Sequence, residues 1–152
     1  FESGNPRIIK KWCSNKLAIN QFDPGDLIKT IKKHGLYVGT NYMLGFPDET
    51  RKEMQITIEF AKKMRDYGLD HSNFYCVMPV PGTPIYDYAI QNGHLPTDYN
   101  PDSFQWTRAN LTNILVPQDE LELIRDKAWN DCNSDFFKSS RKKWVVNSNT
   151  TT

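Results

Sequence analysis

Apolar and polar residues follow two different rhythms along the chain. Two short runs, residues 36–44 and 72–78, are mostly apolar and rich in residues that favour strands, so they are typical of buried β-strands. Elsewhere apolar residues recur every three to four positions, which predicts amphipathic helices. Strands that alternate with such helices indicate βαβ units and a parallel sheet.

Capping residues set the bounds of the predicted helices. Helices are expected at about 6–12, 24–34, 50–67, 84–92 and 118–132. Three of them begin at a capping residue followed by proline, a pair that suits the first helical turn: Asn5-Pro6, Asp23-Pro24 and Thr83-Pro84. The third helix begins with a capping box, in which the Thr50 hydroxyl and the Glu53 carboxylate bond to each other's backbone amides.

The pattern divides the chain into three parts. Residues 1–93 carry the alternation of strands and helices. Residues 94–146 form an irregular covering segment and a last helix, and residues 147–152 are expected to be a disordered tail. The stretch from Phe1 to Gly4 is typical of the end of a strand already under way, so we expect the chain to be a fragment.

Composition narrows the classes of function. Lys and Arg number 19 against 18 Asp and Glu, so charge does not indicate a nucleic-acid partner. No apolar run approaches the roughly 18 residues of a membrane span, and no membrane partner is expected. The three cysteines, Cys13, Cys76 and Cys132, form no CxxC pair, which fits a reducing cytoplasm and leaves no complete metal-ligand set.

Three turns are expected at the same end of the sheet, where parallel α/β folds bind ligands. They are residues 2–4, 45–47 and 81–83, and each follows the carboxyl end of a strand. Glu2 and Ser3 offer polar groups there, and Asn41 interrupts an apolar strand in which asparagine is disfavoured. Asn41 is therefore a candidate ligand contact, with a hydrogen-bonded interior amide as the alternative.

Three segments together resemble a known family. The segments "ESGNPRIIKK", "LYVGTNYMLGFPDET" and "PVPGTPIYDYA", in this order, are similar to the second half of a radical S-adenosylmethionine domain. The branch that it resembles most carries a cobalamin-binding domain upstream. The resemblance implies a partial (β/α) barrel of which only the C-terminal half is present, followed by the irregular and helical extension.

The resemblance also implies cofactors and contacts. In the family, a CxxxCxxC loop holds a [4Fe–4S] cluster that cleaves S-adenosylmethionine to a 5′-deoxyadenosyl radical. That loop is absent here, so the cluster ligands, and the cobalamin domain if one is used, are expected outside this chain. By position, the S-adenosylmethionine contacts are expected at Glu2, Ser3, Lys16 and Asn41, and the catalytic residues are unknown.

Partners and rival functions follow from the same reading. The expected partners are a small-molecule substrate and the upstream half of the same polypeptide, and the candidates for lining the substrate cavity are Tyr99, Phe104 and Trp106. Methyl transfer and related radical reactions are open. One alternative is another barrel enzyme that binds a phosphate or nucleotide at the same face. A degenerate barrel that serves only as a binding module is the other alternative.

Overall fold

The computed structural model describes residues 1–15 and 22–140 of the 152-residue chain. Its elements are α1 (Pro6–Trp12), α2 (Pro24–Lys33), β1 (Gly39–Leu44), α3 (Arg51–Asp66), β2 (His71–Cys76), α4 (Pro84–Gln91), the short 3-10 helix η1 (Pro101–Ser103) and α5 (Gln118–Cys132). The predicted order of helices and strands is therefore confirmed, and the helix bounds agree to within one or two residues.

The two strands form a parallel pair, as the alternation of strands and helices predicts. The register places Asn41 opposite Asn73 and Leu44 opposite Cys76. Backbone hydrogen bonds extend both edges of the pair near its carboxyl end. The Met43 amide donates to the backbone carbonyl oxygen of Glu2 at 2.9 Å. The Cys76 amide donates to the backbone carbonyl oxygen of Trp106 at 2.8 Å.

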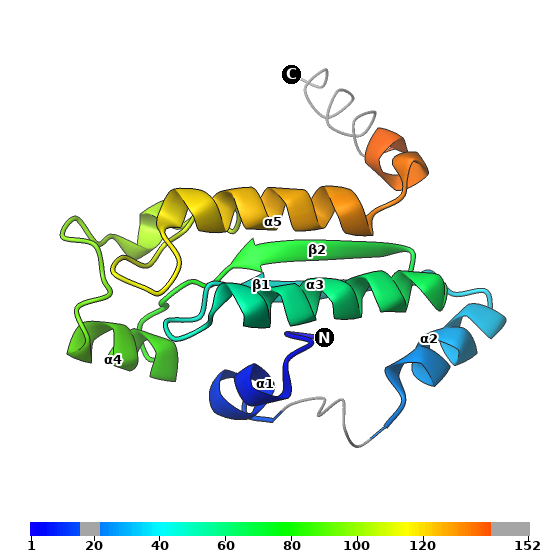
Figure 1. Cartoon of the computed structure of the whole chain (residues 1–152), viewed down its shortest axis with the longest axis horizontal. Coiled ribbons are helices and arrows are strands. Elements are labelled where there is room, and N and C mark those ends of the chain that lie inside the picture. The colour runs from blue at the N-terminus through cyan, green and yellow to red at the C-terminus, as the bar shows by residue number, and fades with distance from the viewer. Residues whose placement is uncertain (16–21, 141–152) are drawn as a thin grey trace.

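One face of this sheet is covered by helices. Alternate residues of each strand point toward α3 and α5, and Figure 1 shows α5 running alongside β2. The main core lies between the sheet and these helices, and its strand residues are Tyr42, Leu44, Phe74 and Cys76. Tyr42 and Phe74 stack with ring centroids 5.2 Å apart, which joins the two strands through their side chains.

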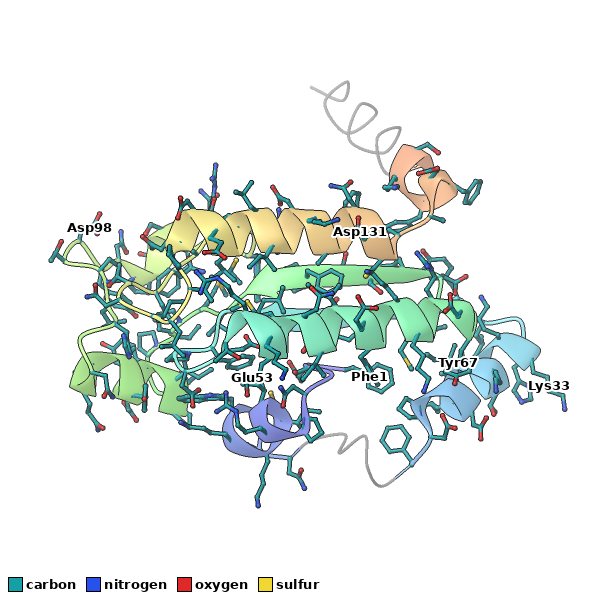
Figure 2. All side chains as sticks on the ribbon, viewed as in Figure 1. Phe1, Lys33, Glu53, Tyr67, Asp98 and Asp131 are labelled. Carbon is teal, nitrogen blue, oxygen red and sulfur yellow. The ribbon has the colours of Figure 1, made fainter. Side chains whose placement is uncertain are left out.

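The N-terminal turn of α3 fixes the position of α1. Thr50 and Glu53 form the predicted capping box, with both reciprocal hydrogen bonds present. The Arg7 guanidinium also reaches both Glu53 carboxylate oxygens, and Glu53 lies at the end of α3 that is nearest α1 (Figure 2). One carboxylate thus caps α3 and attaches α1 to it.

The observed strands are shorter than the predicted ones. The first begins at Gly39 rather than at residue 36, because the Val38 amide donates to the Asp70 carboxylate instead of to a neighbouring strand. The second ends at Cys76, two residues early. The partial barrel itself stays a prediction, since two paired strands are compatible with it and with smaller α/β folds. The predicted tail, 147–152, lies outside the described residues.

Candidate functional site

The uncovered face of the sheet forms an open groove. Its volume is about 540 Å³, within the usual range for a small-molecule site. Residues from both strands, the N-terminal segment and the covering segment line it: Phe1, Glu2, Gly39, Thr40, Asn41, Met43, Tyr75 and Trp106. Among these lining residues Glu2 carries the only formal charge, so the groove favours neutral or cationic ligand groups over phosphate.

Two asparagines meet on this open face. Asn73 lies directly across the sheet from Asn41 and donates from Nδ2 to Asn41 Oδ1 at 3.1 Å. This bond takes up one lone pair of the Asn41 oxygen and fixes the amide orientation, so both N–H groups of Asn41 remain for other partners. Asn41 is exposed and lines the groove, whereas Asn73 is half-buried. The arrangement presents Asn41 chiefly as a hydrogen-bond donor.

The sequence-predicted site residues separate into three cases. Glu2 and Asn41 line the same groove, as predicted, but Asn41 lies in the middle of β1 and reaches the groove from the open face of the sheet rather than from the strand end. Ser3 is fully buried, and its hydroxyl lies 2.9 Å from Thr57 Oγ1 and accepts from the Asn5 amide at 3.0 Å. The structure therefore uses Ser3 to dock the N-terminal segment against α3. Lys16 lies outside the described residues.

Trp106 forms the opposite wall of the groove from Glu2. Its indole is 58% exposed and meets Tyr75 edge-on, with ring centroids 5.4 Å apart. Tyr99 and Phe104, from the same covering segment, instead pack against each other away from the groove, and the Tyr99 hydroxyl donates to the Pro79 oxygen. Of the three predicted cavity residues Tyr99, Phe104 and Trp106, only Trp106 lines the groove.

The turn after β1 is built for the protein rather than for a ligand. Gly45 has a φ of +86°, which favours glycine, and an added Cβ there would lie 2.4 Å from Leu121 of α5. Glu49, only 1% exposed, accepts from the amides of Gly45 and Phe46 through Oε2. Burial raises the pKa of Glu49 to about 8, although those two N–H bonds oppose the shift.

The neighbouring Asp48 is in the opposite electrostatic state. Its carboxylate accepts from Trp12 Nε1, Lys11 Nζ and Arg7 Nη1, each at 2.7 Å. Burial raises the pKa of this carboxyl, but the three hydrogen bonds and the charge of Arg7 outweigh it and hold the pKa at about 2. Asp48 and its donors therefore form a clamp, hereafter the Asp48 clamp, that holds α1 against the turn after β1.

The cysteines do not suit a metal cluster. Cys76 and Cys132 are buried, and desolvation raises the pKa of each thiol to about 11, which disfavours the thiolate that binds metal. Within the described residues, no group of three or more His, Cys, Asp or Glu side chains is placed to hold a metal ion. An iron–sulfur cluster does not fit the residues that the structure describes.

Sequence reasoning missed two features of this region. Asn73 carries the same signal as Asn41, since it too is an asparagine inside a predicted strand. Glu49 gives no such signal, because a glutamate between a turn and a helix cap is usually exposed, whereas here it is folded back onto the amides of its own turn and buried. Among the helices in the described part of the chain, none is long and apolar enough to cross a membrane.

No family model matches the chain, but several curated proteins are similar to it. An uncharacterized methyltransferase of Pyrococcus horikoshii is 40% identical over 100 residues, which cover 64% of this chain and 20% of that protein. The tRNA-2-methylthio-N(6)-dimethylallyladenosine synthase of Shewanella baltica is 31% identical over 57% of this chain and 17% of its own length.

A further relative broadens the range of named reactions. The bacteriochlorophyllide d C-12(1)-methyltransferase of Chlorobaculum tepidum is 26% identical over 57% of this chain and 18% of its own length. The chain spans about a fifth of the length of these relatives. It is therefore similar to one part of enzymes that are named for methyl or methylthio transfer.

Proposed function

We propose that the chain forms the C-terminal part of the barrel of a radical S-adenosylmethionine enzyme that carries out methyl transfer or a related radical reaction. The proposal rests on the agreement between the sequence motifs of this chain and the name of a curated protein that is similar to it. Three segments resemble that family, and the chain is 40% identical over 100 residues to a protein named as a methyltransferase. The structure is compatible with the proposal, because Glu2 and Asn41, from the first two segments, line one groove.

In this proposal the groove holds S-adenosylmethionine on its β1 side. Glu2 would accept a charge-assisted hydrogen bond from the cationic amino group of the cofactor. Asn41 would donate from its amide, since its oxygen already accepts from Asn73. Ser3 would act through the position of the N-terminal segment, because its hydroxyl is already bonded inside the protein.

The [4Fe–4S] cluster would be held by cysteines of the upstream half of the same polypeptide. When bound, the cluster supplies the electron that cleaves S-adenosylmethionine. This chain contributes the cofactor groove and its walls, and is expected to be inactive alone. The cobalamin expectation rests on the sequence resemblance alone.

Cofactor binding in the whole protein tests the proposal. The whole protein is prepared anaerobically and titrated with S-adenosylmethionine. Glu2→Ala is expected to weaken binding about tenfold to a hundredfold, since a hydrogen bond to a charged group contributes roughly 1.5–3 kcal/mol. Asn41→Ala is expected to weaken it less. Lys62→Ala serves as the control and should bind as the unaltered protein does, because Lys62 pairs with Glu59 on α3 and does not line the groove.

Iron content gives an independent test. Replacing Cys13, Cys76 and Cys132 by alanine in the whole protein should leave the iron and sulfide content unchanged. Loss of iron in that variant would show that this chain holds the cluster. Whole protein without iron, with phosphate compounds binding in the groove, would favour the alternative barrel enzyme. Whole protein that holds no iron and binds no phosphate compound in the groove would favour a binding module.

A further inference from the structure

The loop that carries Trp106 is held in place by a buried amide. Asn110, only 9% exposed, donates from Nδ2 to the backbone oxygens of Val77, Gln105 and Arg108, at 3.3, 3.2 and 2.9 Å. Its Oδ1 accepts from the Gln105 amide at 3.4 Å. The residues on both sides of Trp106 are therefore tied to the end of β2 by one side chain.

Trp106 is anchored by its own backbone as well. Its carbonyl oxygen accepts from the Cys76 amide at 2.8 Å, so the residue sits beside β2 like the end of a further strand. The same loop is tied to α5, where Glu122 accepts from the Ala109 amide and from Arg108. The exposure of the indole is thus not a consequence of a loosely held loop.

A fixed and exposed indole needs an explanation, since tryptophan is usually largely buried. The indole lies on the wall of the groove opposite Glu2, and no hydrogen bond to its N–H occurs among the described residues. An indole offers a broad apolar face and one donor at its edge, which suits stacking against a flat ring. Asn41 adds amide donors to the floor of the same groove.

We propose that Trp106 is the platform of the substrate subsite and that the substrate presents a flat, uncharged aromatic or heteroaromatic ring with a hydrogen-bond acceptor on its edge. The ring stacks on the face of Trp106, and its acceptor faces one of the two N–H groups of Asn41, while the other N–H serves the cofactor. None of the described residues that line the groove has a basic side chain, which disfavours a phosphate at this position. The inference rests on the proposed function, which places S-adenosylmethionine on the Glu2 side.

A pair of matched probes tests the ring. Benzamide and cyclohexanecarboxamide carry the same neutral amide, but only benzamide is flat and aromatic. Each is titrated into the whole protein with saturating S-adenosylmethionine, and binding is followed by ligand-observed NMR. Benzamide should bind about threefold to tenfold more tightly, the range expected for one aromatic pair. Trp106→Ala should abolish that preference, and Trp106→Phe should keep part of it.

Phe136→Ala is the control, since Phe136 is 83% exposed at the other end of α5. It should leave the preference for benzamide unchanged. An equal preference in Trp106→Ala and the unaltered protein would overturn the assignment, as would equal affinity for both probes. Tighter binding of benzamide in a titration without S-adenosylmethionine than in one with it would assign the platform to the cofactor and overturn the substrate subsite. Failure of the proposed function is seen separately, as absent binding in the cofactor titration.

Discussion

The two faces of the β1–β2 sheet are made from alternate residues of the same twelve positions, yet they obey different constraints. The covered face packs against α3 and α5, and its apolar residues, Tyr42, Leu44, Phe74 and Cys76, are at most 1% exposed. The open face carries Asn41, Asn73 and Tyr75 and is half-buried or exposed. Packing accounts for these four apolar residues of the covered face and for almost none of the residue types of the open face.

The difference shows where function should be sought in this chain. An apolar strand residue on the covered face is explained by the apolar area that it buries. An asparagine pair and a tyrosine beside an exposed tryptophan bury little, and asparagine is disfavoured in strands. Substitutions on the two faces should therefore separate stability from ligand binding.

The largest effect is expected from adjacent residues on opposite faces. Phe74→Ala should lower the free energy of unfolding by about 3–5 kcal/mol, because it leaves a cavity against Tyr42 and α5. Tyr75→Ala, one residue further along the strand, should cost about 1 kcal/mol, since it removes an edge contact with Trp106. Urea unfolding measures both. Equal losses would mean that the open face is packed in solution.

The next effect concerns Glu49, the buried carboxyl in the turn between β1 and α3. The pKa of Glu49 is raised from 4.5 to about 8, so the folded chain keeps a proton that the unfolded chain releases. Stability should therefore fall as the pH rises from about 4.5 to 8, by an amount on the order of a few kcal/mol. The glutamine side chain of Glu49→Gln cannot ionise, so the melting temperature of this variant should change much less over this pH range.

Melting temperatures of both proteins at several pH values between 5 and 8 measure this difference. Glu53→Gln is not a suitable control, because Glu53 is ion-paired with Arg7. Asp26→Asn, on exposed α2, should retain the full slope of the unaltered chain. Parallel slopes for Glu49→Gln and the unaltered chain would show that Glu49 is ionised in the folded state.

A smaller effect is expected at Asp48, with the opposite dependence on pH. The clamp lowers the pKa of this carboxyl from 3.8 to about 2, so its contribution is complete above pH 4 and is lost as the pH falls toward 2. Asp48→Asn should cost about 1–2 kcal/mol at neutral pH, since it weakens charge-assisted bonds to Arg7 and Lys11. The deficit should shrink in acid, as urea midpoints at pH 2.5 and 7 would reveal.

The smallest effect on stability is expected from the asparagines of the open face. Asn41→Ala and Asn73→Ala should each change the free energy of unfolding by about 0.5 kcal/mol or less, because their mutual hydrogen bond lies at an accessible surface. Both should still weaken S-adenosylmethionine binding in the whole protein, Asn73 through the orientation of Asn41. A loss of several kcal/mol in stability would make the pair structural.

Local sequence signals predicted the elements because each signal acts within a few residues. The start of α3 is indicated by Thr50 and Glu53, and the start of α2 by Asp23 and Pro24. The Asp23 carboxylate caps the N-terminus of α2, as expected. The start of β1 escaped prediction, since the Asp70 carboxylate that binds the Val38 amide is 32 positions away in sequence.

The site was predictable only in part, for the same physical reason. Glu2 and Asn41 were correctly expected on one groove, although Asn41 lies within β1 rather than at its end. The burial of Ser3 depends on Thr57, and the pinned loop around Trp106 depends on Asn110, contacts that no local pattern encodes. The pKa of Asp48 is lowered and that of Glu49 is raised, and the sequence, in which they are adjacent acidic residues, gives no sign of this difference.

The double role of Glu53 has a consequence for anyone who transplants or redesigns this turn. The same carboxylate closes the capping box of α3 and holds the Arg7 guanidinium. The capping box therefore cannot be moved alone into another protein, because its glutamate also binds an arginine 46 positions upstream. During evolution a change at either residue would weaken two helices together, so the two sites are expected to vary as a pair.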